Sequence, residues 1–457
     1  MRLNSRLFSG LAACLVLGAV VAVAWAVDPV GIRLAQRGKT SRTTAAKPGT
    51  NDLALLEAKR GDWSRWRGPN GDGVSQEKGL LSEWPEEGPP LAYTASGLGK
   101  GMSSIAVADG HIYTMGDGDG TAILCLKVED GAQVWRTPIG GGGANCTPTV
   151  DGDLVFGVSQ EGDLACCETK TGKLLWKMNF QKDFGGKKPG WGFSESPLVD
   201  GEMLIVTPGS DEALLVALDK RTGDVAWKTK MPGNAGPKGH GGAGYSSIVI
   251  GNCGGVKQYI TLTGKGVVGV DAKSGELLWG YNKVANGTAS IPTPIVQGDH
   301  VFCSSGYDDG GTALLKISKQ GKGLTAAEVY WQDANKLQNH HGGMILIGDH
   351  VYMGHGHNRG FPVCVELKSG QPTWGPSRGP SADGGSAAIA YADGHLYFRY
   401  QDATMALIEA NPKDYKVKGK FKLATHNGES WPHPVIAGGK LYCRDQDNLL
   451  CYDVQQK

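Results

Sequence analysis

The stretch GDLACCETKTGKLLW, residues 162–176, combines an apolar strand-like run, a Thr-Gly step and a terminal tryptophan. This ending recurs in register along the chain, with gaps of 41, 51, 52, 52 and 43 residues between successive tryptophans. Such regular spacing is typical of a chain built from one repeated supersecondary unit. The copies are KVEDGAQVW (Trp135), ETKTGKLLW (Trp176), DKRTGDVAW (Trp227) and DAKSGELLW (Trp279), with the degenerate copies VYW (Trp331) and ELKSGQPTW (Trp374).

Each copy has an upstream partner with strand and turn signals. In TPTVDGDLVFGVS, which begins at Thr147, apolar residues alternate with small or polar ones, as in half-buried strands. Asp-Gly and Gly-Asp pairs favour the positive φ angles of hairpin turns, and so does the Thr-Gly step. One unit therefore predicts four strands, TPTV, DLVFGV, DLACCET and KLLWKM. Many such units in series indicate a β-propeller, in which the tryptophan of the fourth strand fills the space between blades.

Eight units can be counted, with first strands near residues 103, 147, 196, 246, 292, 343, 386 and 432. The last unit stops at Tyr452–Val454, after its third strand. The segment LAYTASG, residues 91–97, precedes the first unit and has no other partner. We therefore expect an all-β, eight-bladed propeller of four-stranded antiparallel blades. Its ring is closed by this N-terminal strand, because closure removes an exposed sheet edge.

The adjacent cysteines Cys166 and Cys167 fall inside the third strand of their unit. Cys166 aligns with Cys125, Cys364 and Cys451 of other copies, so it occupies a recurrent core position. Neighbouring strand residues point to opposite faces, which disfavours a disulfide between the two. We expect the cysteines to be mostly small buried hydrophobic residues.

The N-terminus predicts export. Two arginines precede an apolar run that ends in Ala-Trp-Ala at residue 26, so residues 1–26 are typical of a signal peptide. An uncleaved membrane anchor is the alternative, and a lipoprotein box ending at Cys14 is a weaker third. Residues 27–61 are basic and lack aromatic residues, which predicts a flexible linker before a propeller at 62–457. The formal net charge of +1 offers no electrostatic basis for binding nucleic acid.

The repeat resembles the pyrroloquinoline quinone (PQQ)-like propeller repeat, on the a-strand SP-x-V, the G-D-x-V-Y strand and the L-D-x-x-TG-x-x-x-W ending. WSRWRGPNGDGVS (residues 63–75) is similar to an exported bacterial subgroup named after the propeller subunit of the outer-membrane β-barrel assembly machinery. The resemblance implies either a cofactor-free scaffold that binds peptide or protein segments or, more distantly, a quinoprotein dehydrogenase. The dehydrogenases hold PQQ and calcium in the central funnel. We expect Trp63, Trp66 and Trp84 to cap the closing blade.

In a propeller, the loops that enter the innermost strands line one mouth of the channel. Here these loops are rich in glycine, aromatic, acidic and imidazole groups, and His357 is expected on a nearby loop between second and third strands. Glu195 with Asn145 offers oxygen ligands of the kind calcium takes, and His340, His341 and His433 offer a transition-metal alternative. The candidate ligand-binding residues are Asn145, Trp191, Glu195, His240, Tyr245, His340, His341, Trp431 and His433.

The sequence lacks a haem C-x-x-C-H motif and a convincing base-plus-calcium set on adjacent blades. We therefore expect a periplasmic or envelope-associated binding or scaffold protein without catalytic residues, metal or cofactor. Its expected partners are envelope protein or peptide segments, or a small polar ligand, with membrane contact only through an uncleaved N-terminus. One alternative is a PQQ-dependent quinoprotein oxidoreductase of alcohols or sugars, with PQQ and calcium. The other is a carbohydrate- or peptide-binding module.

Overall fold

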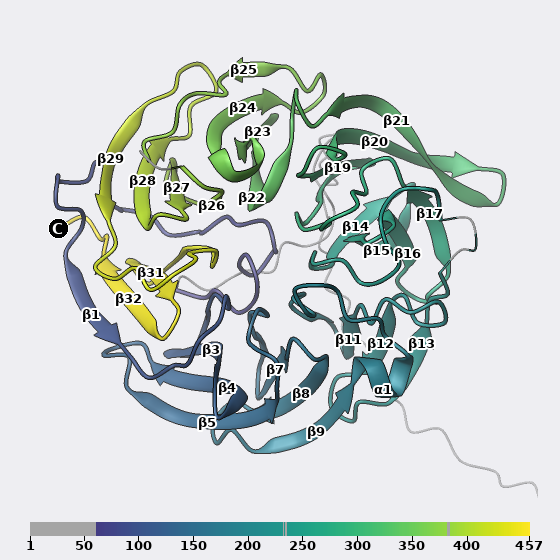
Figure 1. The fold of residues 1–457 in the computed structure, drawn as a ribbon, viewed down its shortest axis with the longest axis horizontal. Helices are drawn as coiled ribbons and strands as arrows, with labels where there is room; N and C mark the ends of the chain where they lie inside the picture. Colours follow the sequence, from purple (N-terminus) through teal and green to yellow (C-terminus); the bar gives the residue numbers. More distant parts are fainter. Residues whose placement is uncertain (1–60, 232, 234, 382–383) are drawn as a thin grey trace, which may run out of the picture. The chain divides into compact units, whose positions relative to one another are not determined.

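The computed structural model describes residues 61–457, apart from 232, 234 and 382–383. The described residues form eight four-stranded antiparallel sheets, arranged as the blades of a ring (Figure 1). They belong to one compact unit, Gly49–Lys457. The predicted signal peptide and all of the predicted linker except Gly61 lie outside the described residues. The eight-bladed propeller expected from the repeats is confirmed.

The blades follow one another along the chain, each running from the inner strand to the outer one. Blades 1 to 4 consist of β2 (Ala106–Ala108), β3 (His111–Gly118), β4 (Gly120–Lys127) and β5 (Gln133–Gly140); β6 (Thr149–Asp151), β7 (Leu154–Val158), β8 (Asp163–Glu168) and β9 (Leu174–Asn179); β10 (Leu198–Asp200), β11 (Met203–Val206), β12 (Val216–Asp219) and β13 (Val225–Lys228); and β14 (Val249–Cys253), β15 (Val256–Thr263), β16 (Gly266–Asp271) and β17 (Leu277–Tyr281).

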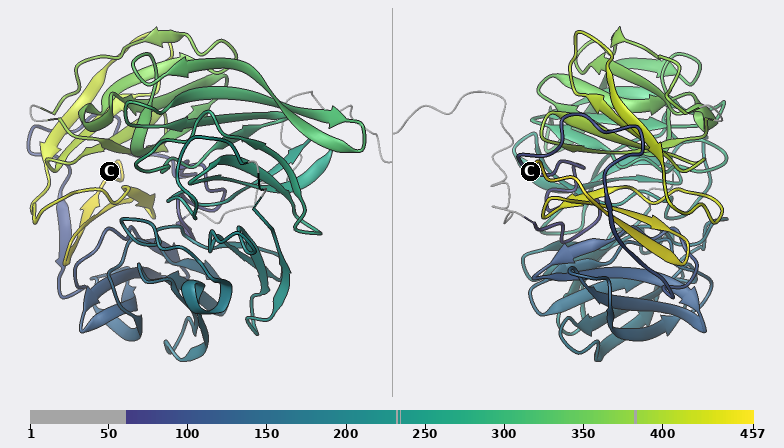
Figure 2. Two further views of the ribbon diagram at one scale, coloured as in Figure 1. Left: turned by 45° about the vertical axis from the view of Figure 1, so that its right-hand side comes forward. Right: turned by 90° about the vertical axis from the view of Figure 1, so that its left-hand side faces the viewer.

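Blades 5 to 7 continue the same order around the ring, and the views in Figure 2 show the blades stacked face to face. They consist of β18 (Ile295–Gln297), β19 (His300–Ser305), β20 (Gly311–Gln320) and β21 (Gly323–Asp333); β22 (Asn339–Ile347), β23 (His350–His355), β24 (Phe361–Glu366) and β25 (Pro372–Trp374); and β26 (Ala387–Ala392), β27 (His395–Tyr400), β28 (Thr404–Glu409) and β29 (Val417–Lys422).

Blade 8 joins the two ends of the described chain. It contains β30 (Val435–Ala437), β31 (Lys440–Asp445) and β32 (Asn448–Asp453), and its fourth strand is β1 (Leu91–Ala95), which pairs antiparallel with β32. Closure by the N-terminal strand is therefore confirmed. The described helices are short: α1 (Phe180–Phe184) and the 3₁₀ turn η1 (His357–Arg359). No described helix has the length and apolar character needed to cross a membrane.

One aromatic–glycine contact links successive blades. The Trp135 indole of β5 donates a hydrogen bond to the carbonyl of Thr169, in the β8–β9 turn of the next blade, at 2.8 Å. Gly172 in that turn has a φ of +72°, and a Cβ on it would lie 2.6 Å from the Trp135 ring. Trp176 packs on Gly223 and Trp227 on Gly275 in the same way. At these three junctions the Thr/Ser-Gly step of one blade therefore accommodates the tryptophan of the preceding blade.

Tyrosine replaces tryptophan at two junctions. Tyr93 of the closing strand packs on Gly131, and its hydroxyl donates to the carbonyl of Val128 at 2.8 Å. Between blades 5 and 6 the packed ring is Tyr330, whose hydroxyl donates to a β24–β25 turn carbonyl at 2.9 Å. The alignment of Trp331 with the repeated tryptophan is therefore wrong by one residue. The bulge in the β20–β21 pairing precedes Tyr330, as the corresponding bulge precedes the tryptophan in other blades.

Trp84 fills the one place where a blade has no large residue at this position. In β29 the residue after the bulge is Gly419, and a Cβ there would lie 2.6 Å from Trp84 Cβ. The Trp84 ring meets Tyr397 and Phe421 edge-on at 5.6 and 5.3 Å. This side chain of the N-terminal segment therefore packs beside the closing blade, as expected.

Cys166 and Cys167 are fully buried on β8 and free. The other cysteines of the described chain are also buried and free. Burial raises the pKa of both thiols to about 12, so the reactive thiolate is disfavoured. The interpretation of this pair as core residues is confirmed.

Residues 63–75 cross the end of the channel opposite the mouth loops, and the purple trace in Figure 1 reaches the middle of the ring. Trp63 pairs with Val107 at the end of β2, and Val74 pairs with Tyr391 at the end of β26. The Ser75 hydroxyl donates to a β30 carbonyl at 2.8 Å. We call this segment the plug. Because it bonds to several inner strands, it closes the far side of the channel.

We predict that Gly172→Ala destabilises the protein by about 3 kcal/mol, because the new methyl group must displace Trp135 and the turn must keep a left-handed backbone. Gly152→Ala is the matched control in the same blade. Its φ is +58°, but no atom lies within 4 Å of its added Cβ, so it carries the backbone cost alone. Thermal unfolding of the full chain measures both. Equal losses in the two variants would contradict the packing role of Gly172.

Candidate functional site

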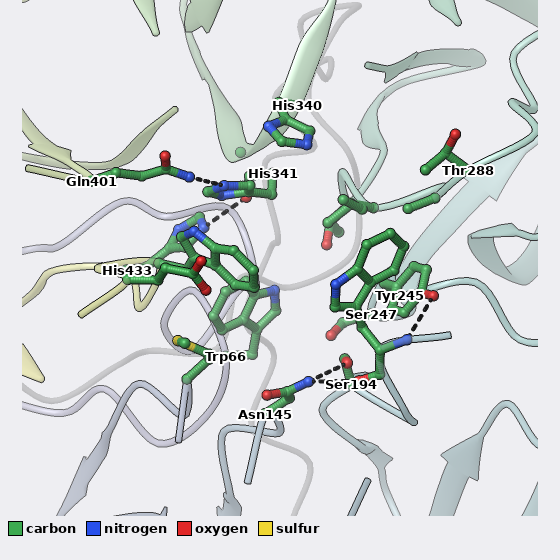
Figure 3. Close-up of a pocket in the computed structure, with 18 of the residues that line it drawn as sticks. Trp66, Asn145, Ser194, Tyr245, Ser247, Thr288, His340, His341, Gln401 and His433 are labelled. Carbon is green, nitrogen blue, oxygen red and sulfur yellow. Dashed lines mark hydrogen bonds between the residues drawn. The ribbon is translucent and has the colours of Figure 1, made fainter. Parts of the chain in front are cut away.

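A cavity of about 530 Å³ lies at the centre of the propeller (Figure 3). Its walls come from loops that enter the inner strands, from loops between second and third strands, and from the plug. Seven of the nine predicted residues line it. These are Asn145, Trp191, Tyr245, His340, His341, Trp431 and His433.

The plug supplies the floor of the cavity. Trp66 and Arg67 line it, and the Trp66 ring lies 4.5 Å from the His433 ring. Trp66 thus packs on a residue that leads into the closing blade, as expected, and it also lines the cavity. Trp63 of the same plug is buried, and its backbone pairs with Val107 of blade 1.

Trp191 and Tyr245 form the mouth on one side. The Trp191 side chain is 47% exposed, and its ring lies 5.9 Å from the Tyr245 ring. The Trp191 backbone N–H donates to the Tyr245 hydroxyl at 3.2 Å, and the Asn145 amide donates to the Trp191 carbonyl and the Ser194 hydroxyl, both at 3.0 Å. This network, of which Figure 3 labels Asn145, Ser194 and Tyr245, holds the exposed Trp191 ring at the entrance.

A cluster of imidazole rings faces the Trp191 side of the mouth. The His340 ring lies 4.6 Å from His341 and 4.3 Å from His357, and Tyr307 lies 5.0 Å from His340. Ser386 donates its hydroxyl proton to the carbonyl of His357, so it accepts from His340 Nδ1 at 2.5 Å. His340 Nε2 then accepts from the Tyr307 hydroxyl at 3.1 Å. Partner groups thus hold His340 in one tautomer.

Burial keeps these imidazoles uncharged. Desolvation is the first cause that lowers the pKa of His340 to about 2 and of His341 and His433 to about 3, and neighbouring positive groups act in the same direction. At neutral pH the three rings therefore act as hydrogen-bonding groups without charge. Gln401 donates to His341 Nε2 at 3.1 Å, and His433 Nε2 donates to the His341 carbonyl at 3.3 Å.

The structure does not favour the transition-metal interpretation. His340, His341 and His433 already use ring nitrogens in hydrogen bonds with protein groups. Across residues 61–457 with their gaps, no group of three or more His, Cys, Asp or Glu side chains is placed to hold a metal ion.

Glu195 does not line the cavity, in contrast to the prediction. It is buried behind the wall, where one carboxylate oxygen accepts from the Thr207 backbone N–H and the other has no partner. Burial raises the pKa of Glu195 to about 7. Glu195 therefore contributes no oxygen to a shared calcium site with Asn145.

His240 also lies outside the central cavity. It lines a smaller hollow of about 210 Å³ formed by glycine-rich loops, and its Nε2 contacts the Gly287 carbonyl. Tyr245 and Thr288 line both hollows. His240 was predicted from its loop alone, and loop membership does not determine the side on which a side chain emerges.

Several lining residues were not predicted. Tyr307, Gln401 and Asn358 lie on loops between second and third strands, and Met102 precedes the first inner strand. The Gly-Pro-Asn-Gly turn next to Trp66-Arg67 was the only sequence signal for the floor, and it predicts a turn without its location.

The donor set does not fit PQQ with calcium. Calcium takes six to eight oxygen ligands, commonly with several carboxylates. Among the described lining residues the only carboxylate is Glu429, which is exposed. The other described lining residues provide aromatic rings, imidazoles, amides, hydroxyls and a few aliphatic side chains, with Arg67 as the one guanidinium. This set can stack on flat or apolar groups and hydrogen-bond to polar ones.

We predict that Glu195→Gln changes the pH dependence of stability. The folded pKa of Glu195 is raised from 4.5 to about 7, so the wild type loses the associated stability as pH rises through this range. The variant does not titrate there. Between pH 5 and pH 9 the stability of the variant relative to wild type should increase by about 3 kcal/mol. Thermal unfolding at the two pH values measures this, and a pH-independent difference would contradict it.

Comparison with solved structures shows the same architecture. The quinohemoprotein alcohol dehydrogenase from Comamonas testosteroni matches with a TM-score of 0.61 and 12% identity, over 89% of this chain and 82% of that one. BamB from Moraxella catarrhalis matches with a TM-score of 0.54 and 12% identity, over 80% of this chain and 98% of that one. At these identities the likeness shows the fold alone.

Sequence comparison matches the chain to BamB proteins. The outer membrane protein assembly factor BamB of Salmonella typhimurium is 30% identical over 110 residues, which are 22% of this chain and 27% of the relative. The chain spans about a quarter to a third of the length of the first curated relatives that it matches. The sequence model of the PQQ_2 family, described as outer membrane protein assembly factor BamB, matches residues 52–159 and 122–376. The chain therefore belongs to this BamB-like family of PQQ-type propellers.

Proposed function

We propose that this protein is exported and binds a peptide segment or a small polar ligand in its central cavity, without catalysing a reaction. The names of its relatives place them at the outer membrane, which supports an envelope location for this chain. The observation that carries the proposal is the cavity itself. It is blocked by the plug at one end and presents Trp191 at the other.

The position of Trp191 distinguishes it from other exposed apolar side chains. The remaining exposed large hydrophobic residues of the described chain lie on outermost strands, for example Leu175 on β9 and Val225 on β13. An exposed indole beside a hollow of this size is typical of a binding site. Its neighbours supply amide and hydroxyl groups that match peptide or sugar polarity.

The neutral imidazoles support binding over chemistry. General acid–base catalysis works best when the pKa of the group is near the working pH. The pKa values of His340, His341 and His433 are far below it, and each ring already has at least one nitrogen in a hydrogen bond with a protein group. The fold likeness to quinoprotein alcohol dehydrogenases makes an oxidoreductase the second candidate, but the donor set gives it little support.

Trp191→Ala tests the proposal. We expect a panel of short peptides and neutral disaccharides, each at 10 mM, to contain members that raise the melting temperature of the full chain. The same members should have at least tenfold lower affinity for Trp191→Ala, because the ring at the mouth is lost. Leu175→Ala, on an outer strand, is the control and should bind as the wild type does.

Two results would contradict the proposal. One is equal stabilisation of wild type and Trp191→Ala by every binding member, which would place binding outside the cavity. The other is a rise in melting temperature with PQQ plus calcium, accompanied by alcohol- or sugar-dependent dye reduction.

A further inference from the structure

Arg67 places a buried positive charge at the floor of the cavity. Arg67 is 3% exposed, and the carboxylate of Asp72 in the same plug acts on it electrostatically without an ion-pair contact between the two side chains. Nη2 donates to the backbone carbonyls of Asp72, at 2.9 Å, and Met344. Nε is buried and has no hydrogen-bond partner. Removing a charge from water is costly, and Asp72 offsets this cost only in part, because burial still lowers the pKa of the Arg67 guanidinium to about 10.

Two further buried polar atoms without partners belong to the same wall. They are Trp431 Nε1 and His433 Nδ1, and both residues line the cavity with Arg67. The three side chains lie around the first half of β22, near His341 and Gly343. A Cβ on Gly343 would lie 2.8 Å from Arg67 Nη1 and 2.9 Å from His433 Cε1, and the Trp431 ring lies 5.4 Å from His341.

These unpartnered atoms indicate which kind of ligand group the floor of the cavity can bind. Arg67 Nε and Trp431 Nε1 are N–H donors that need acceptors. His433 Nδ1 is an acceptor, because Nε2 of the uncharged ring donates to the His341 carbonyl, so it is not one of the donors that a carboxylate would satisfy. Unsatisfied buried donors are costly, so a native site that keeps them calls for an explanation. A carboxylate supplies the negative charge and acceptor oxygens in the planar geometry that a guanidinium matches.

The rings around the floor indicate what the carboxylate is attached to. Trp66 lies against His433, and Trp431 lies against His341, so the space above Arg67 is walled by aromatic faces. The only carboxylate among the described lining residues, Glu429, is exposed and leaves the floor to the ligand.

We propose that the floor of the cavity binds the carboxylate of its ligand through Arg67 and Trp431, with the apolar part of the ligand held against the aromatic wall. The inference rests on the proposed binding function and names the end of the ligand that enters first. The carboxylate comes either from a small aromatic acid or from the C-terminus of a peptide.

Matched acid and amide pairs test this. The probes are benzoate and benzamide, and N-acetyl-Gly-Phe with a free or an amidated C-terminus, titrated calorimetrically into the full chain at pH 7. We expect the acid of at least one pair to bind about tenfold or more tightly than its amide, because hydrogen bonds to charged groups are the stronger ones. The pair that shows the difference identifies the source of the carboxylate.

Arg67→Gln should remove the preference for the acid. Arg65→Gln is the matched control, because Arg65 lies in the same plug, donates to the Pro69 carbonyl and does not line the central cavity. If Arg67→Gln does not fold, Trp431→Phe is the second variant. It keeps an aromatic ring at this position but lacks the indole N–H, so it should reduce the affinity for the acid by about fivefold to tenfold.

The outcomes separate this inference from the proposed function. Acid and amide binding equally, or an acid preference that survives in both Arg67→Gln and Trp431→Phe, would overturn the carboxylate site and leave the cavity as a binding site. No binding of any of the four probes at 10 mM would also overturn the carboxylate site, while the disaccharides and end-blocked peptides of the wider panel still test the cavity.

Discussion

The packing of an aromatic ring on the glycine turn of the next blade is the contact on which the rest of the propeller depends. A four-stranded blade cannot cover both of its faces, so its stability comes from its neighbours. Trp135 on Gly172 shows how the chain meets this need, with an indole hydrogen bond that sets its orientation and a glycine that leaves room for the ring. Substitution of tyrosine at Tyr93 and Tyr330 keeps both features.

The N-terminal segment completes what the repeats leave open. It adds β1 to blade 8, places Trp84 over Gly419 where blade 7 lacks an aromatic ring, and closes one end of the channel with the plug. The same thirty or so residues therefore stabilise the ring and turn a channel into a pocket with a floor. Fold and site are coupled through this segment, since Trp66 and Arg67 are positioned by the strand pairings on either side of them.

The character of the pocket follows from burial. Desolvation keeps the imidazoles of His340, His341 and His433 uncharged, so the wall is polar without being ionic. Arg67 is the exception, because a guanidinium retains its charge under nearly all conditions. A cavity whose guanidinium is buried at the floor, while its one carboxylate among the described lining residues is exposed, is asymmetric, and this asymmetry can orient a ligand.

The sequence by itself determined the number of blades, the strand order within each, the closing strand and the core role of Cys166 and Cys167. Periodicity and turn chemistry are local, and they recur often enough to be counted. It also indicated most of the mouth, because loops that enter inner strands converge in any propeller. Only the tertiary structure decided that Glu195 turns into the core, that His240 belongs to another hollow, and that Trp66 and Arg67 form the floor. Those positions depend on contacts outside the local sequence pattern, from Glu195 with Thr207 to Arg67 with Met344, a residue 277 positions further along the chain.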